Sequence, residues 1–359
     1  MTEQRSSAWI SPPGETIEDL LEERGWTKAE LAERLGCTPK HVNELLKGRA
    51  TINATMAAAL SRVLGSTPEF WLEREARYRA ALENKAAAAP LQSMSSWLKE
   101  LPIAWMKKQK WIPDIEGGGD LVDACLRFFN VASVDAWRKV YLAPHAAYRS
   151  SPKFKKQPGA VAAWLRRAEL EASELQCAPW NEKGFKALLS ELRALTCESD
   201  PEAFVRRLQE ACARHGVAVV FVPAPRGCPV CGATWWLSPS KAVLALSLRH
   251  KTNDHLWFAF FHEAGHLIRH SKKIEFVEGL DGLDMALEEE ANLFASQQLI
   301  PPQFESELRT LRSHADVQEF AEHIGVHPGI VVGRLQFDKR IKWNQMNDLK
   351  QRYQWTDDE

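Results

Sequence analysis

Two histidines and a glutamate in the C-terminal half of the chain have the spacing of a metal site. The run His262-Glu263-Ala264-Gly265-His266 has the pattern HExxH. Residues four positions apart share one face of a helix, so both imidazoles can reach one ion. Zinc takes imidazole ligands in a tetrahedral site, and a catalytic site keeps one position for water, beside which Glu263 would act as general base. We therefore expect one zinc ion at His262 and His266, although other divalent metals would fit.

A third ligand for this ion is expected from a second helix. The acidic run Glu288-Glu289-Glu290 opens the helical sequence EEEANLFASQQLIPP, in which Ala291 and Ala295 form a face that allows close packing. Glu288 projects near that face and is the expected ligand, whereas Glu289 and Glu290 would be solvated or support the ligands. The alternative is that the triplet only begins a solvated helix, where acidic residues suit the helix dipole.

Two further groups near the HExxH motif leave alternatives open. His270 lies on nearly the same helix face as His262 and would either support a ligand or substrate, or be a polar residue at the helix end. Cys228 and Cys231 form a CxxC pair, but a structural zinc site needs four ligands, and no second pair is evident. A buried or loop thiol pair is the expected interpretation.

The segment from Lys28 to Lys47 (KAELAERLGCTPKHVNELLK) has the pattern of a helix-turn-helix motif. Ala32 is a small residue where the second helix approaches, and Gly36 stands where the turn favours a positive φ. Thr38 can cap the second helix, and Pro39 suits its first helical position. We therefore expect the recognition helix over residues 38–47.

In this class of motif the start of the recognition helix enters the major groove of DNA. The residue types and positions predict base contacts from Thr38, Lys40, His41 and Asn43, and phosphate contacts from Lys47 and Arg49. Such modules usually bind as dimers, so we expect a homodimer on double-stranded DNA. A helical hairpin used for protein contact is the alternative.

Composition sets limits on these interpretations. The chain has 359 residues, a formal charge of −1, 45% hydrophobic and 26% charged residues, as in an ordinary globular protein. Bulk electrostatics cannot hold such a chain on DNA, so any DNA affinity must be local. Seven cysteines are no disulfide framework, the N-terminus has no signal peptide pattern, and no apolar run could span a membrane. We expect a cytoplasmic protein that does not enter a membrane.

Hydrophobic periodicity places the motifs in a mainly helical chain with a small β-sheet. We expect a DNA-binding domain over 1–82, a helical middle region of unknown role over 83–200, a metal domain over 201–335 and a helical tail over 336–359. Residues 84–90 (NKAAAAP) are expected to be a fraying helix end and a linker, and the last helical portion to run over 316–354. Short strands are expected at 217–222, 234–237 and 242–248. Six of the 14 Trp fall in the middle region, which indicates a packed domain there.

The N-terminal segment resembles HigA-type antitoxins of the lambda-repressor-like (XRE) helix-turn-helix superfamily. The resemblance spans residues 13–72 and is carried by PGE, KAELAERLG, LLKGRATIN and GSTPEFWLEREARY. It implies a five-helix DNA-binding domain that acts as a regulator, and in toxin–antitoxin systems such domains bind their own operator.

Residues 200–335 resemble the ImmA/IrrE family of metallopeptidases, through FFHEAGHLIRH, EEEANLFASQQLIPP and GATWWLSPSKAVLALSLR. The resemblance implies an α+β, zincin-like (gluzincin) fold, with a small sheet beside the HExxH helix and a glutamate helix. The glutamate of the family's E-x-x-A pattern is its third ligand and corresponds to Glu288. Family members often cleave, or promote cleavage of, a helix-turn-helix repressor.

Two functions follow from these motifs. The first is a DNA-binding transcriptional regulator with a zinc-dependent endopeptidase domain, in which Glu263 is catalytic and a repressor or partner protein is the substrate. The alternative is a non-catalytic, HigA-like antitoxin or regulator whose metal domain senses a ligand or binds a toxin. The expected partners are operator DNA, one such protein and a second copy of the chain.

Overall fold

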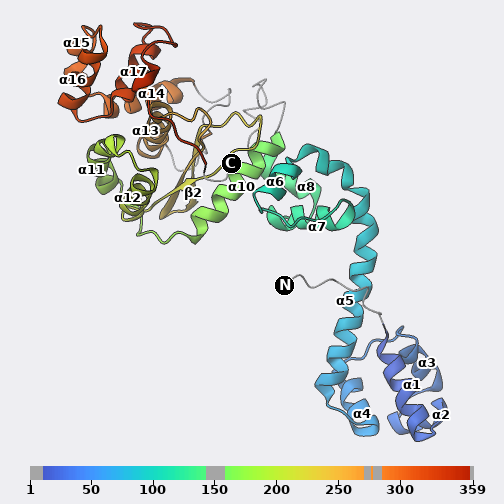
Figure 1. The fold of residues 1–359 in the computed structure, drawn as a ribbon. Coiled ribbons are helices and arrows are strands. Elements are labelled where there is room, and N and C mark those ends of the chain that lie inside the picture. The colour runs from blue at the N-terminus through green and yellow to red at the C-terminus, as the bar shows by residue number, and fades with distance from the viewer. Residues whose placement is uncertain (1–10, 143–157, 271–275, 278–284, 356–359) are drawn as a thin grey trace. The chain divides into compact units, whose positions relative to one another are not determined.

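The computed structural model describes residues 11–142, 158–270, 276–277 and 285–355 (Figure 1). The described chain is mainly helical with one small sheet, as the sequence predicts. It divides into two compact units, the first formed by Met1–Ser95 with Gly117–Asp120 and the second by Ser96–Glu116 with Leu121–Glu359. Within the described ranges, no helix combines the length and apolar character needed to cross a membrane.

The first unit is a five-helix bundle. Its helices are α1 (Pro13–Arg24), α2 (Lys28–Leu35), α3 (Pro39–Leu46), α4 (Ala54–Leu64) and α5 (Pro68–Ser93), and α1 to α4 gather around the first turns of α5 (Figure 1). Their starts follow from sequence, since the side chains of Thr27, Thr38, Asn53 and Thr67 each accept a backbone N–H hydrogen bond as N-caps. Apolar residues from all five helices form one core around the fully buried Trp71.

The linker expected at residues 84–90 is wrong, because α5 continues through it to Ser93. The run of four alanines has the highest intrinsic helix propensity. Pro90 lacks one backbone N–H and would be expected to break a helix, yet the helix passes through it. The helix-forming tendency of the alanines therefore outweighs the breaking effect of this single proline.

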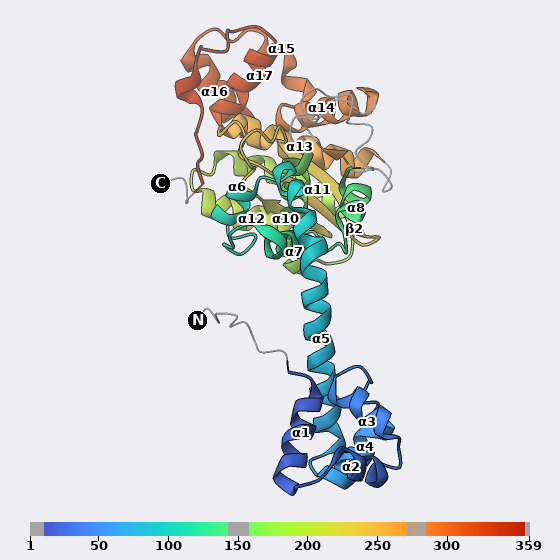
Figure 2. The same ribbon diagram turned by 90° about the vertical axis from the view of Figure 1, so that its right-hand side faces the viewer.

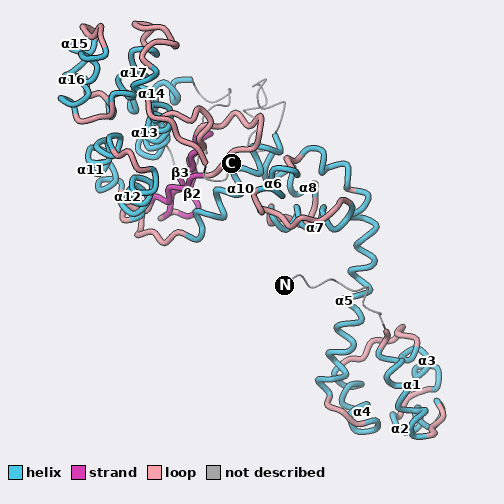
Figure 3. The backbone as a smooth tube through the Cα atoms, in the orientation of Figure 1, coloured by secondary structure: helices cyan, strands magenta, loops and turns pink. Residues whose placement is uncertain are grey.

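The sheet of the second unit has four strands in the order β1-β3-β2-β4. Figure 3 shows β2 and β3 side by side in magenta. These are β1 (Val217–Phe221), β2 (Gly232–Ser238), β3 (Lys241–Leu246) and β4 (Phe276–Val277). The first three confirm the predicted short strands, and β1 runs parallel to β3 while β2 runs antiparallel to both β3 and β4.

Both faces of this sheet are covered, which explains the continuous apolar runs of β1 and β3. Alternate side chains point to opposite faces. Val217, Val219 and Leu244 belong to the larger core on one face, whereas Val220 and Val243 pack with residues of α10 (Pro158–Glu174) on the other. The expected middle region therefore supplies one cover of the sheet.

The second unit also contains the following helices. Before β1 come α6 (Ile103–Lys108), α7 (Gly118–Phe128), α8 (Val134–Trp137), α11 (Glu182–Leu192) and α12 (Pro201–Ala213). Helix α13 (Asn253–Arg269) lies between β3 and β4, and β4 is followed by α14 (Met285–Leu299), α15 (Glu305–Leu308), α16 (His314–Ile324) and α17 (Pro328–Phe337). Short 3-10 helices lie at Ser95–Glu100, Arg193–Cys197, Pro302–Phe304 and Asn347–Leu349, and a π-helix at Arg138–Leu142. Trp97, Trp137 and Trp164 are fully buried, in agreement with the packed middle region that the tryptophans predict.

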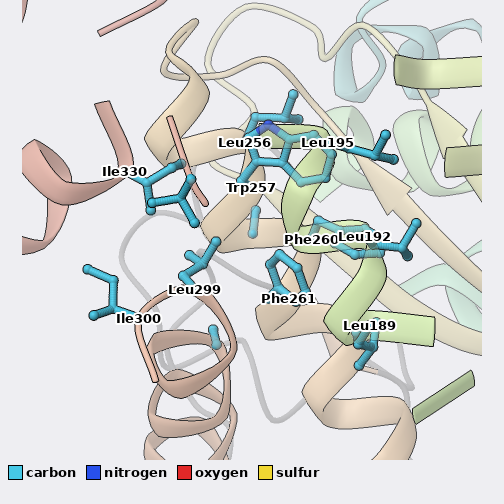
Figure 4. Packing of buried hydrophobic residues seen from close by; sticks show 14 of the residues in the cluster. Leu189, Leu192, Leu195, Leu256, Trp257, Phe260, Phe261, Leu299, Ile300 and Ile330 are labelled. Atoms are coloured by element: carbon cyan, nitrogen blue, oxygen red, sulfur yellow. The ribbon is translucent and has the colours of Figure 1, made fainter. Parts of the chain in front are cut away.

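Helix α13 lies in the centre of the larger core. Its aromatic residues Trp257, Phe260 and Phe261 lie between leucines that come from α11 and the turn after it on one side and Leu299, Ile300 and Ile330 on the other (Figure 4). The helix is therefore held from several directions at once, and this packing fixes the direction of the HExxH side chains that it carries.

The helical tail expected over 336–359, and the helical portion expected up to residue 354, are wrong over 338–355, because α17 ends at Phe337 and only the short 3-10 helix Asn347–Leu349 follows in this range. The last four residues of the expected tail, 356–359, lie outside the described residues. Lys339 and Met346 adopt positive φ, which no helix allows. The buried side-chain amide of Gln336 donates to the carbonyls of Trp343 and Gln345, so the chain turns back instead of continuing.

The chain that follows these turns pairs with the start of α13. The backbone N–H of Asn253 donates to the carbonyl of Gln351 over 3.0 Å, and the N–H of Tyr353 donates to the carbonyl of Lys251 over 2.9 Å. The Lys350 ammonium lies 2.6 Å from the Asp254 carboxylate, and both side chains are 7% exposed. We call residues 350–353 the return segment, and it ties the first turn of α13.

Candidate metal centre and DNA-binding surface

The candidate metal ligands come from two helices that pack tightly. Helices α13 and α14 lie side by side (Figure 2), and they approach most closely where Gly265 faces Ala291 and Phe294. A Cβ on Gly265 would lie 3.0 Å from the Phe294 ring and 3.4 Å from the Cα of Ala291. This is the close packing expected from Ala291 and Ala295, and it brings Glu288 across from the two histidines.

The ligand atoms of His262, His266 and Glu288 converge on one point. The Nε2 atoms of the two histidines are 2.9 Å apart, and the Glu288 carboxylate oxygens lie 3.3 Å from His262 Nε2 and 3.4 Å from His266 Nε2. Tetrahedral zinc with bonds of 2.0–2.1 Å would place its ligand atoms about 3.3 Å apart. Among the residues that the structure describes, this is the one cluster of three or more histidine, cysteine or acidic side chains that could hold a metal ion.

The electrostatics of the cluster favour the ligand forms of these side chains. Burial lowers the pKa of His266 to about 4, so its imidazole is neutral near pH 7. Burial alone would raise the pKa of Glu288, but hydrogen bonds and charge interactions with His262 and His266 outweigh it and lower the pKa to about 2. A neutral His266 imidazole and an ionised Glu288 carboxylate are donors that suit zinc.

A second layer of side chains orients the two histidines. His262 Nδ1 donates to the Asn292 Oδ1 over 3.0 Å, which leaves its Nε2 lone pair toward the cluster. The Nδ1 atoms of His266 and His270 are 2.9 Å apart, and the Nε2 of His270 lies 3.3 Å from Glu290 Oε2. His270 thus lies where it would support a ligand, one of the two alternatives that the sequence left open.

Glu263 is fully buried beside the sheet. Gly232, the first residue of β2, faces it so closely that a Cβ there would lie 2.8 Å from Glu263 Cγ and 2.9 Å from Oε1. Because Glu263 directly follows His262 on α13, this glycine gives its carboxylate the space to remain next to the ligands.

The CxxC pair contributes no metal ligands within the described residues, whose one candidate cluster lacks cysteine. Neither thiol belongs to a disulfide within those residues, and Cys228 is buried while Cys231 is half-buried. Burial raises the pKa of Cys228 to about 11, so the thiol stays protonated and unreactive near neutral pH.

The recognition helix α3 presents most of the predicted DNA contacts to solvent. Thr38, Lys40, Asn43, Lys47 and Arg49 are exposed. The Thr38 hydroxyl accepts the backbone N–H of His41 as the N-cap, so it supports the helix as well as facing outward. His41 itself is half-buried. The motif's glycine, Gly36, has the positive φ that the turn requires.

Comparison with known proteins gives both units a family. Residues 17–72 match the helix-turn-helix family model, and residues 212–336 match the model of the IrrE N-terminal-like domain. The uncharacterized HTH-type transcriptional regulator YddM of Escherichia coli (strain K12) is 33% identical over 73 residues, which cover 20% of this chain and 78% of that protein. The chain belongs to the XRE-type helix-turn-helix family.

This XRE-type protein also carries a domain of the IrrE/ImmA-like peptidase family, and that match contains His262, Glu263, His266 and Glu288. The two family matches confirm both resemblances that the sequence indicates. A solved structure of an addiction module antidote protein of a HigA family from Coxiella burnetii is 29% identical, with coverage of 23% of this chain and 94% of that chain and a TM-score of 0.21.

Two residues of the peptidase domain were not recognised in the sequence. Asn292 lies four residues after Glu288, a spacing that puts both on one helix face. This spacing could have indicated that Asn292 lies near the candidate ligands. Gly232 gave no comparable signal, since its importance depends on a contact between β2 and α13 that sequence spacing does not encode.

Proposed function

We propose that this helix-turn-helix regulator is also a zinc-dependent endopeptidase that cleaves a protein partner, such as a DNA-bound repressor. The observation that carries the proposal is the convergence of His262, His266 and Glu288 within 4.8 Å of one another, beside the buried Glu263. A neutral His266 imidazole beside an ionised Glu288 carboxylate, in a largely buried site, is an arrangement that a bound metal ion would stabilise.

The chain's own residues would divide the chemistry as follows. A bound zinc ion would polarise the scissile carbonyl and make a water molecule more acidic. Glu263 accepts the proton of the attacking water on its carboxylate while the water oxygen adds to the carbonyl carbon. The C–N bond then breaks, and Glu263 returns the proton to the leaving amine nitrogen. Asn292 holds His262 and His270 holds His266 in position throughout.

The test is to incubate the purified, zinc-loaded protein with the repressor encoded beside its gene and to map the products by mass spectrometry. We expect defined fragments with wild type and none with Glu263→Gln. The matched control is zinc stoichiometry, because Glu263→Gln keeps all three ligands and should still bind one ion. No cleavage by wild type, or equal cleavage by the variant, would refute the peptidase function and favour the regulator that senses a ligand or holds a toxin.

The first unit supports a separate part of the proposal, which is that a homodimer binds operator DNA in the cytoplasm. Lys47 and Arg49 are exposed cations just beyond the end of α3 and are the proposed phosphate contacts. Lys47→Ala should weaken binding to a fragment from the upstream region and reduce the slope of log affinity against log salt by about one for each phosphate no longer neutralised. Arg77→Ala removes an exposed cation on α5 and is the control. An unchanged slope for Lys47→Ala would remove this residue from the interface.

A further inference from the structure

A cavity of about 220 Å³ lies between α13, α14 and α17, within the second unit. Its walls are mostly apolar, and its principal lining residues are Phe258, Leu299, Ile300, Ile330, Phe337 and Trp343. Leu299, Ile300 and Ile330 are almost fully buried, whereas Phe337 is 65% and Trp343 61% exposed. Two large aromatic side chains therefore remain open to solvent around an apolar interior, which is an unusual surface for a globular domain.

The cavity continues the helix faces that hold the metal ligands. Phe258 lies one turn before His262 on α13, and the two ring centroids are 6.2 Å apart. Ser296, another lining residue, lies one turn after Asn292 on α14, and Asn292 is the residue that orients His262. One helical turn advances about 5.4 Å. A group in the cavity would thus lie next to a reaction centre at the ligand cluster.

The polar residues of the wall leave little for a charged ligand to recognise. Arg334 is paired with Glu305 at 2.8 Å and with Asp338 at 2.9 Å. Asp254 is paired with Lys350 in the return segment. Burial lowers the pKa of His255, so this side chain is neutral at pH 7. An uncharged, apolar occupant is favoured.

The size of the cavity limits the occupant further. Pockets for whole drug-sized ligands usually measure about 300–1,000 Å³, so this one suits a single large side chain. We propose that it is a specificity pocket that takes one leucine, methionine or phenylalanine side chain of the polypeptide substrate, next to the scissile bond. This inference rests on the proposed endopeptidase function, because continuity with the metal ligands is what assigns a peptide to the cavity.

The first arm of the test needs no catalysis. Full-length Glu263→Gln protein labelled with 5-fluorotryptophan is titrated with capped amino-acid amides, and the ¹⁹F resonance of Trp343 is assigned from its loss in Trp343→Phe. N-acetyl-leucinamide and N-acetyl-phenylalaninamide should shift that resonance saturably, and N-acetyl-glycinamide should not. Ser296→Phe, which fills the cavity, should abolish the shift. Gln297→Phe adds the same ring at the exposed neighbouring position and should keep it. No shift, or the same shift with the glycine probe, overturns the pocket.

In the second arm, the wild type, Ser296→Phe and Gln297→Phe each cleave a mixture of peptides from a digested proteome, and the cleavage sites are compared. We expect large apolar side chains at one fixed position beside the cut. Ser296→Phe should reduce kcat/KM for those peptides by roughly 10- to 200-fold, the range by which apolar pockets discriminate between side chains, and Gln297→Phe should not. Cleavage without this preference overturns the pocket. Absence of all cleavage refutes the peptidase function instead, and the fluorine titration then decides the pocket alone.

Discussion

The hydrogen bond from His262 to Asn292 gives the sharpest prediction about the metal centre. Asn292→Ala removes the acceptor of the His262 Nδ1 proton, which lies 3.0 Å away in the wild-type chain. That bond holds the imidazole in the tautomer whose Nε2 lone pair points to the other ligands. Without this bond, the free protein also populates the other tautomer, whose Nε2 is protonated and cannot bind a metal ion. Binding must then shift the equilibrium to the ligand tautomer, so zinc affinity should fall.

The size of this loss in zinc affinity depends on the other contacts that hold the His262 ring. Loss of such a supporting partner typically costs 10- to 100-fold in metal affinity. The His262 side chain is 1% exposed and packs near Phe258, so its orientation should survive the substitution and only its tautomer preference should change. We therefore expect the lower end of that range, about tenfold, which corresponds to about 1.4 kcal/mol.

The assay is competition for zinc against a chromophoric chelator at pH 7, with the full chain. Asn292→Asp is the informative partner variant, because a carboxylate still accepts from Nδ1 and should restore affinity to the wild-type value or above it. Glu289→Ala removes an exposed polar residue from the same helix and should change nothing. The reasoning fails if Asn292→Ala binds zinc as tightly as wild type, or if Asn292→Asp is as weak as Asn292→Ala.

Three further predictions concern pH, the general base and stability. The pKa of His266 is lowered to about 4, so the unfolded chain binds more protons than the folded one between pH 6.5 and 4. The free energy of unfolding of the metal-free protein should therefore fall by up to roughly 3 kcal/mol as the pH falls through this range. Urea unfolding would contradict this if the free energy of unfolding had the same pH dependence in wild type and His266→Gln. Gly232→Ala must displace Glu263, so peptide turnover should fall about 100-fold while zinc stoichiometry stays constant, and equal loss of both would argue against this geometry. Lys350→Ala leaves the Asp254 carboxylate buried and unpaired, which should cost about 3–5 kcal/mol in unfolding free energy, and a change under about 1 kcal/mol would show that the pair is only a surface interaction.

The candidate metal cluster of His262, His266 and Glu288 could be predicted largely from spacing along single helices. His262 and His266 are four residues apart, and small residues follow Glu288 at helical spacing. In a helix, residues at these spacings lie on one face, so the sequence already indicates which side chains are close together. The positive φ of Gly36 and the N-cap role of Thr38 could likewise be predicted, because both depend only on local backbone conformation. What could not be predicted are contacts between elements, such as Gly232 against Glu263, since they depend on how β2 lies against α13.

The errors in the fold have a similar origin. Residues 84–90 carry opposing local signals, helix-forming alanines and a helix-breaking proline, and composition alone does not weigh one against the other. Beyond Phe337 the chain leaves the helix because Gln336 and Lys350 find partners outside it. The use of α10 as a cover for the sheet is also a tertiary fact, as its alanine-rich face has no signature of its own.

The position of the return segment near the end of the chain means that it is synthesised well after the helix that it secures. The contacts that tie the start of α13 join residues far apart in the chain: 96 positions separate Lys350 from Asp254, and 98 separate Gln351 from Asn253. A ribosome adds about 5–20 residues each second. The HExxH sequence therefore emerges several seconds before the residues that secure its helix. A newly made chain therefore contains His262, His266 and Glu288 before α13 is secured, and the proposed peptidase activity should appear only after translation has passed the return segment.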